Sequence, residues 1–124
     1  MPKTKGDSVR IGRQYEEIAL QYLASKGFGF IAKNFHSRYG EIDLIMQKNG
    51  VLHFIEVKSS RSINPLLKIT PAKLHKIIKT IYVFLAQYEY SCDFCIDALA
   101  IYQDHVAFVE NVTLFFENFT AYNT

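Results

Sequence analysis

The chain has 124 residues, of which 49% are apolar and 21% are charged, and its net charge is +2. This length suits one domain over residues 1–124, and ten Phe and eight Tyr residues exclude an intrinsically disordered chain. The longest unbroken apolar run, residues 81–86, is far shorter than the ~20 residues that cross a bilayer. The N-terminus lacks the apolar stretch of a secretory signal, so we expect a cytoplasmic protein without membrane association.

The charges are divided along the chain. All fourteen Lys and Arg residues lie within residues 1–79, which carry six acids and a net charge of +8. Residues 80–124 carry six acids and no basic residue. This division predicts one basic face for an anionic partner, although solvated charges that merely cluster would give the same pattern.

The first expected element is a helix over residues 8–26, preceded by a flexible segment, residues 1–7. Its apolar residues recur at helical spacing, at Ile11, Tyr15, Ile18 and Tyr22. Gly27 ends the helix, and a short strand is expected over residues 28–34.

A β-hairpin follows. Two strand-like runs, residues 41–47 and 51–58, flank Asn49 and Gly50, the favoured pair for a two-residue type I′ turn. The opposite face of both runs is apolar, through Ile42, Leu44, Met46, Ile55 and Val57. We therefore expect both strands to be buried on at least that face.

The remaining elements complete an α/β pattern. Residues 59–69 are polar and basic and are expected to form a surface loop. Thr70 and Pro71 are typical of an N-cap and a first helical position, so a helix is expected over residues 71–89. Two strands are expected near residues 94–102 and 105–112, while residues 113–124 have no assignment. The order α, three β, α, two β predicts a mixed sheet flanked by helices.

The hairpin register predicts an unusual pair of acids. A two-residue turn places Asp43 directly across from Glu56, and Glu41 across from Lys58. Carboxylates this close destabilise a sheet unless a cation compensates them, and their hard oxygen ligands suit Mg²⁺ or Mn²⁺. Lys58 shares the face of Glu56, which fits metal-assisted phosphodiester hydrolysis. The alternative is an ordinary Lys58–Glu41 ion pair beside solvated carboxylates.

Glu16 is a third candidate ligand, because its position on the first helix falls inside the apolar arc. A carboxylate that faces a core costs several kcal/mol unless it is paired or bound to a metal. The alternatives are a side chain that reaches solvent and a charge partner of the helix N-terminus.

A basic segment follows the second hairpin strand. It contains no acid before Glu89 and carries Lys58, Arg61, Lys68, Lys73, Lys76 and Lys79. We expect Arg61, Lys68, Lys73 and Lys76 to contact the phosphates of a nucleic acid, with a solvated helix face as the alternative.

Three motifs resemble a known family. They are Glu16-x-x-Ala19-x-x-Tyr22-Leu23, Gly40-Glu41-Ile42-Asp43-Leu44-Ile45 and Phe54-Ile55-Glu56-Val57-Lys58. Together they closely resemble the YraN-like family of bacterial proteins. That family is grouped with the PD-(D/E)XK nuclease superfamily and is most similar to archaeal Holliday-junction resolvases.

The resemblance implies a restriction-endonuclease-like domain with an αβββαβ core. It implies that Asp43 and Glu56 bind Mg²⁺ (or Mn²⁺), that Lys58 aids the attacking water, and that Glu16 completes the catalytic site. The implied reaction is endonucleolytic cleavage of DNA. The analogy with resolvases further implies branched DNA as the substrate and a homodimer as the active form. A DNA-binding module without turnover and a protein–protein adaptor are the alternative functions.

The chain departs from the family pattern at a few positions. Tyr15 stands where a small residue is usual, and Ser60 where Arg is usual. An Arg-Phe-Asp element is represented only by Cys95-Ile96-Asp97. Cys92 and Cys95 form a lone CxxC, and the four His residues show no zinc-ligand spacing, so we expect structural cysteines.

Overall fold

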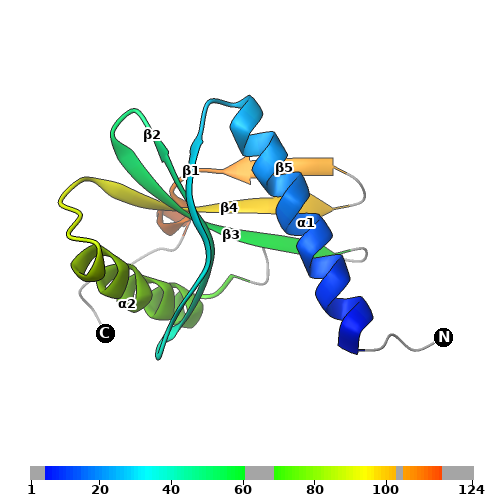
Figure 1. The fold of residues 1–124 in the computed structure, drawn as a ribbon, viewed down its shortest axis with the longest axis horizontal. Helices are drawn as coiled ribbons and strands as arrows, with labels where there is room; N and C mark the ends of the chain where they lie inside the picture. The colour runs from blue at the N-terminus through cyan, green and yellow to red at the C-terminus, as the bar shows by residue number, and fades with distance from the viewer. Residues whose placement is uncertain (1–4, 61–68, 103–104, 116–124) are drawn as a thin grey trace.

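The structure of the protein, a computed structural model, describes residues 5–60, 69–102 and 105–115 (Figure 1). In order, the elements of this part are α1 (Lys5–Ser25), β1 (Gly29–Ser37), β2 (Gly40–Lys48), β3 (Val51–Ser60), α2 (Pro71–Gln87), β4 (Phe94–Tyr102), β5 (His105–Val109) and the 3-10 helix η2 (Val112–Phe115). The strands form one sheet in the order β1-β2-β3-β4-β5. Neighbouring strands are antiparallel except β3 and β4, which are parallel. The predicted α/β class with a mixed five-stranded sheet is confirmed.

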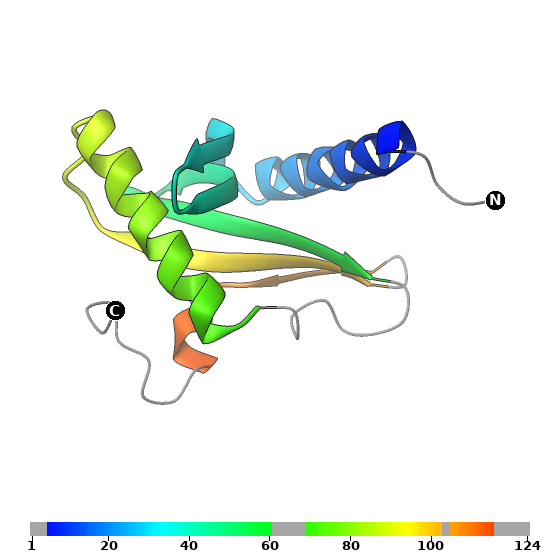
Figure 2. The ribbon, with the colours of Figure 1, turned by 90° about the horizontal axis from the view of Figure 1, so that it is seen from below.

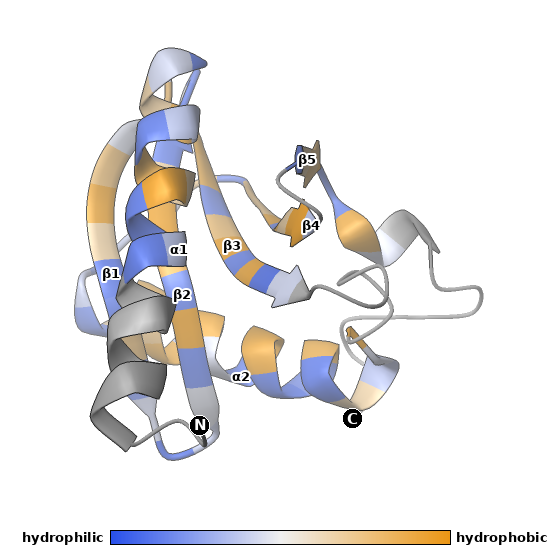
Figure 3. Ribbon diagram, turned by 90° about the vertical axis from the view of Figure 1, so that its right-hand side faces the viewer, coloured by the Kyte–Doolittle hydropathy of each residue, from blue (hydrophilic) through white to orange (hydrophobic). Residues whose placement is uncertain are grey.

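The two helices cover opposite faces of the sheet (Figure 2). α2 connects the parallel strands β3 and β4 and packs on one face with Phe54 and Phe84 in its core. α1 packs on the other face with Leu23 and Leu44 in its core. Hydrophobic and hydrophilic residues alternate along α2 and along the coloured part of α1 in Figure 3, as expected of helices that bury one side. Neither helix, over the described residues, is long and apolar enough to cross a membrane.

The boundaries of several elements differ from expectation. α1 begins at Lys5, three residues before the expected start, because the apolar stripe that indicated this helix starts at Ile11 and the first turns are polar. Residues 1–4 lie outside the described residues. β1 extends to Ser37 and α2 ends at Gln87, whereas β4 has the predicted bounds. The C-terminal strand is shorter than expected and is followed by η2.

The expected surface loop over residues 59–69 is corrected at both ends. Ser59 and Ser60 belong to β3, because their parallel partners on β4, Ile101 and Tyr102, extend the ladder past Lys58. Ile69 is 7% exposed and belongs to the core beneath α2. The intervening residues 61–68 lie outside the described residues.

The turn between β2 and β3 has the predicted conformation. Asn49 and Gly50 both have positive φ, 52° and 78°, as a type I′ turn requires. The ladder runs from Lys48↔Val51 to Leu44↔Ile55, which confirms the predicted register over this span. Thr70 caps α2 through its side chain, which accepts from Lys73 N at 3.3 Å, also as predicted.

One prediction about the hairpin is wrong at Ile42. Leu44, Met46, Ile55 and Val57 share one face, as expected, and that face is the α1 side, but Ile42 packs with the α2-side core. The break lies at Asp43, the residue between Ile42 and Leu44, where the β2–β3 ladder has ended and where the neighbouring strand β1 carries Asn34 with a left-handed φ of 52°. Because the regular alternation breaks there, Ile42 and Leu44 face different sides of the sheet.

Two hydroxyls, one half-buried and one fully buried, join the β1–β2 turn to α2. Thr80 of α2 is fully buried, and its Oγ1 lies 2.8 Å from Ser37 Oγ at the end of β1. Ser37 Oγ also accepts from Tyr39 N at 3.0 Å, so the same hydroxyl shapes the turn. This contact holds the start of β2 beside the helix that carries Lys76.

We expect the Ser37–Thr80 hydrogen bond to contribute measurably to stability. Thr80→Val, which keeps the shape and removes the hydroxyl, should lower the free energy of unfolding by about 1–3 kcal/mol. A double-mutant cycle with Ser37→Ala, measured by urea unfolding, should give a coupling energy of about 0.5–1.5 kcal/mol. Additive losses would show that the two hydroxyls act independently.

Candidate active site

The candidate site lies where β2 separates from β3. The ladder between them ends at Leu44↔Ile55, although β2 continues along β1 to Gly40 and β3 continues along β4 to Ser60. Asp43 is the first residue past the split. Its Oδ2 accepts a hydrogen bond from Val57 N at 2.8 Å, so a side chain takes over where the backbone ladder stops.

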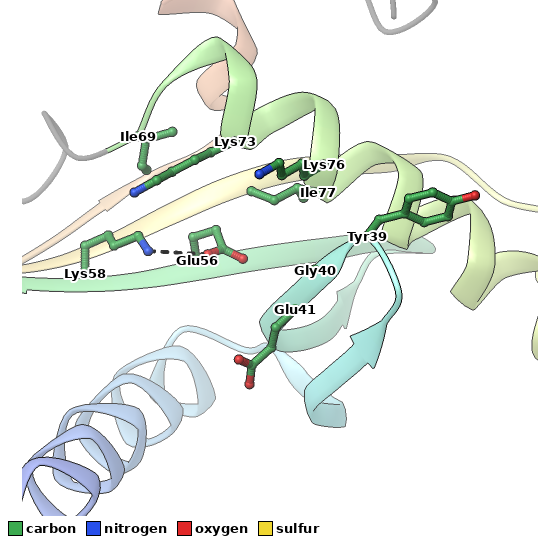
Figure 4. A pocket seen from close by; sticks show the side chains of 9 residues that line it. All are labelled: Tyr39, Gly40, Glu41, Glu56, Lys58, Ile69, Lys73, Lys76 and Ile77. Carbon is green, nitrogen blue, oxygen red and sulfur yellow. Dashed lines mark ion pairs between the residues drawn. The ribbon is translucent and has the colours of Figure 1, made fainter. Parts of the chain in front are cut away.

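Glu56 is the most strongly buried acid of the predicted set. The residue is 7% exposed, and its Oε1 is buried without a hydrogen-bond partner among the described residues. Its Oε2 lies 3.7 Å from Lys58 Nζ, the ion pair drawn in Figure 4. The Lys58 side chain is 25% exposed, so its ammonium reaches solvent on the same side.

A pocket of about 320 Å³ opens beside Glu56 and Lys58. Figure 4 shows Lys73 and Lys76 extending from α2 on the far side of this pocket, facing the strand that carries Glu56. The complete lining consists of Tyr39, Gly40, Glu41, Glu56, Lys58, Ile69, Lys73, Lys76 and Ile77. A buried carboxylate and three lysines therefore share one cavity between α2 and the split strands.

Glu16 is held near this region but not in the pocket. Its Oε2 accepts a hydrogen bond from Asn34 Nδ2 at 3.2 Å, and its side chain is half-buried between α1 and β1. The left-handed Asn34 lies beside Asp43 in the register, so it brings the Glu16 carboxylate toward Asp43. The three carboxylates of Glu16, Asp43 and Glu56 do not converge as tightly as a compact metal cluster.

Burial is the largest cause of the raised pKa values of both central acids. Burial raises the pKa of Glu56 from its ordinary 4.5 to about 8, repulsion from Asp43 adds to the shift, and Lys58 opposes it. The pKa of Asp43 is also raised, chiefly by burial, with smaller contributions from the charges of Glu41 and Glu16. The hydrogen bond from Val57 and the charge of Lys58 oppose the shift at Asp43. The pair therefore disfavours two negative charges.

The donor set fits a hard divalent cation. A buried carboxylate oxygen without a partner is costly, and a divalent ion would both coordinate it and remove the repulsion between the two acids. Asp43 and Glu56 are the residues that could hold such an ion, with Glu16 nearest to them from α1.

The alternative pairing of Lys58 with Glu41 does not form. Lys58 pairs with Glu56 on its own strand, and Glu41 Oε1 lies 3.6 Å from His36 Nε2 instead. The strands have already separated at this point, which removes the expected cross-strand contact. Of the predicted phosphate-contacting residues, Lys73 and Lys76 line the pocket, whereas Arg61 and Lys68 lie outside the described residues.

Tyr39 is a pocket residue that sequence reasoning missed. Its ring lies 4.8 Å from the Arg38 guanidinium carbon and 5.6 Å from Lys79 Nζ, measured to the ring centroid. An aromatic residue beside Arg38 in a turn that follows a strand was the available signal. Ile69 and Ile77 are the isoleucines that line the pocket. Apart from the apolar stripe of α2, no sequence pattern marked them as pocket residues.

Comparisons with known proteins give one consistent family. The uncharacterised protein family UPF0102, the YraN-like family, matches residues 15–101. A UPF0102 protein of Helicobacter pylori (strain HPAG1) is 48% identical over 102 residues, which cover 82% of this chain and 90% of the relative. A UPF0102 protein of Wolinella succinogenes is 46% identical over 103 residues, 83% of this chain and 95% of the relative. One from Campylobacter fetus subsp. fetus is 44% identical, covering 82% and 92%.

The raised pKa of Glu56 predicts a pH-dependent stability. Between pH 4.5 and about 8 the folded protein keeps a proton that the unfolded chain has lost, so the free energy of unfolding should fall as pH rises through this range. Each unit of pKa displacement corresponds to about 1.4 kcal/mol. Glu56→Gln should flatten this decline when urea unfolding is measured in the presence of a chelator.

Two further measurements complete this test. Adding Mn²⁺ should stabilise the wild-type protein more at pH 8 than at pH 5, because the ion binds the ionised carboxylates. Glu17→Gln, on the exposed side of α1, is the matched control and should leave the pH profile unchanged. Parallel pH profiles for Glu56→Gln and the wild type would contradict the assigned pKa shift.

Proposed function

The chain belongs to the UPF0102 family, and from this premise and the site just described we propose that the protein is a metal-dependent endonuclease that hydrolyses phosphodiester bonds in DNA. The observation that carries the proposal is the buried Glu56 oxygen without a partner, beside a second acid and facing a lysine-lined pocket. A purely structural sheet would gain nothing from burying this group. The resemblance of the Asp43, Glu56 and Lys58 pattern to PD-(D/E)XK nucleases supports the same reading.

The residues divide into ligands and groups that act on substrate. Asp43 and Glu56 would hold Mg²⁺ or Mn²⁺, with Glu16 completing the set from α1. When bound, such an ion polarises a phosphoryl oxygen and lowers the pKa of a water. Lys58 Nζ lies beside Glu56 and reaches solvent, so it can donate a hydrogen bond that orients the attacking water. It also places a positive charge near the charge that develops on the phosphate.

The lysines of α2 would bind the DNA backbone. Lys73 and Lys76 are exposed and face the pocket, so they can contact phosphates on either side of the scissile bond. Backbone contacts of this kind place the strand without reading its sequence. Arg61 and Lys68 would extend the same surface.

Branched DNA is the substrate class we propose, and a homodimer is the form that would cut it. The support is the similarity to Holliday-junction resolvases. A four-way junction has two strands to cut symmetrically, so two copies of the site related by a two-fold axis match its symmetry.

Cleavage assays test the assigned residues. Linear, flapped and four-way-junction DNA should be incubated with the protein and Mg²⁺ or Mn²⁺, and products separated on denaturing gels. Asp43→Ala and Lys58→Ala should each reduce the cleavage rate by about 100-fold or more, since each removes a group needed in the transition state. Glu17→Ala should cleave at the wild-type rate.

The outcomes of this assay are distinct. Cleavage that survives both Asp43→Ala and Lys58→Ala would show that the activity arises elsewhere. Binding of every substrate without cleavage would contradict the nuclease and favour a DNA-binding module with the same fold.

DNA binding should depend on the α2 lysines and on salt. Combining Lys73→Ala with Lys76→Ala should weaken DNA binding and reduce the slope of log K against log salt by about 2, because two phosphate contacts are lost. Lys26→Ala with Lys33→Ala removes the same charge from exposed positions outside the pocket and is the matched control. Equal slopes for the two double variants would contradict a specific α2 surface.

A further inference from the structure

A second cluster of ligand-type side chains lies on the other face of β3. His53 of β3 and Cys95 of β4 are direct partners in the parallel ladder, and Asp97 lies two residues further along β4. All three point to the α1 side, where the Phe28 ring packs edge-on against the His53 ring at 4.9 Å. Glu56 and the pocket lie on the α2 side, so this cluster is separate from the candidate active site.

The ligand atoms of the three residues converge. His53 Nδ1 lies 2.5 Å from Asp97 Oδ2 and 3.2 Å from Cys95 Sγ. Cys95 Sγ in turn lies 3.2 Å from Asp97 Oδ1. Within the described residues this is the one group of three His, Cys, Asp or Glu side chains whose ligand atoms all lie within 4.8 Å of one another.

The cluster is also shielded. The side chains of His53 and Asp97 are 9% and 0% exposed, while Cys95 is half-buried and leaves one side open. A buried carboxylate beside an imidazole and a thiol is a combination that apolar packing alone does not require. Its atoms instead match a known set of metal donors.

We propose that His53, Cys95 and Asp97 form a binding site for a transition-metal ion of the zinc class. Imidazole nitrogen, thiolate sulfur and carboxylate oxygen are the three donor types that Zn²⁺ takes in proteins. Mixed nitrogen and sulfur ligands disfavour Mg²⁺, which prefers oxygen, so the two faces of β3 would hold different ions. This inference does not depend on the proposed nuclease function.

The present spacing is close to that of a loaded site. Zinc bonds of about 2.0–2.3 Å in a tetrahedron place neighbouring ligand atoms roughly 3.3–3.7 Å apart. The two contacts of Cys95 Sγ, both 3.2 Å, are already near this separation. Entry of the ion requires mainly that His53 Nδ1 and Asp97 Oδ2 move apart by about 1 Å from their 2.5 Å hydrogen bond.

Groups outside the cluster fix its orientation. Asn111 N donates to Asp97 Oδ1 at 2.9 Å, so the carboxylate is held from the loop after β5. Hydrogen bonds of this kind orient metal ligands and tune their affinity.

In the metal-free cluster the Cys95 thiol carries the proton that it donates to Asp97 Oδ1. Binding of the ion replaces that proton at sulfur with a metal–sulfur bond and releases the proton to solvent. No change in oxidation state is involved.

Cobalt titration of the full chain tests the proposal. Co²⁺ is the probe, because a thiolate ligand gives a sulfur-to-cobalt charge-transfer band and a tetrahedral site gives strong visible bands. One equivalent should produce both signals, and Zn²⁺ should displace them. Zn²⁺ should also raise the thermal unfolding midpoint of the wild-type protein, a readout that needs no variant.

Matched variants locate the site. Cys95→Ser should abolish the charge-transfer band, and His53→Gln should weaken Co²⁺ binding by more than about tenfold. Cys92→Ser, at the exposed cysteine three residues away, and Asp43→Ala should both retain the band. Circular dichroism spectra should show that each variant is folded.

Two results would overturn the proposal. One is a wild-type protein that shows neither a charge-transfer band nor stabilisation by Zn²⁺. The other is a band that persists in Cys95→Ser and disappears in Cys92→Ser, which would assign the metal to the exposed thiol. Either result would leave His53, Cys95 and Asp97 as a hydrogen-bonded structural group.

Discussion

The repulsion between Asp43 and Glu56 is the constraint on which the candidate site depends. Burial raises the pKa of both carboxyls, and the charge of Asp43 raises the pKa of Glu56 further. The fold tolerates the pair through three local contacts: the Val57 amide on Asp43, a backbone hydrogen bond to Glu56, and the Lys58 ammonium. These three contacts leave Glu56 Oε1 without a hydrogen-bond partner among the described residues, so this oxygen is available to coordinate a cation.

The same constraint explains the shape of the sheet around the pair. If the β2–β3 ladder continued, Asp43 and Glu56 would be directly opposed cross-strand neighbours, which is destabilising for two like charges. Instead, the ladder ends at Leu44↔Ile55, and the Asp43 side chain takes the next amide. The separated start of β2 is held against α2 by Ser37 and Thr80. The pocket is the space that this separation leaves, and the lysines of α2 line it because the helix crosses there.

Local chemistry made much of this arrangement predictable from sequence. The Asn49–Gly50 turn sets the register of the hairpin through short-range geometry, and that register holds as far as Leu44↔Ile55, the pair next to Asp43 and Glu56. The Thr70 cap and the apolar stripe of α2 are equally local. The flip at Ile42 was not predictable, because Ile42 lies past the end of the β2–β3 ladder and so outside the register that the turn sets. The membership of Ser59 and Ser60 in β3 likewise depends on β4, which is remote in sequence.

The cluster of His53, Cys95 and Asp97 was also not predictable from sequence, again because it depends on contacts between strands that are remote in sequence. Its ligands are 42 and 44 residues apart in sequence and meet because β3 and β4 pair in parallel around the α2 crossover. Spacing rules for zinc sites assume ligands on one turn or one hairpin, so they pass over such a set. Both candidate sites therefore depend on β3, which presents Glu56 to α2 and His53 to α1 from positions three residues apart.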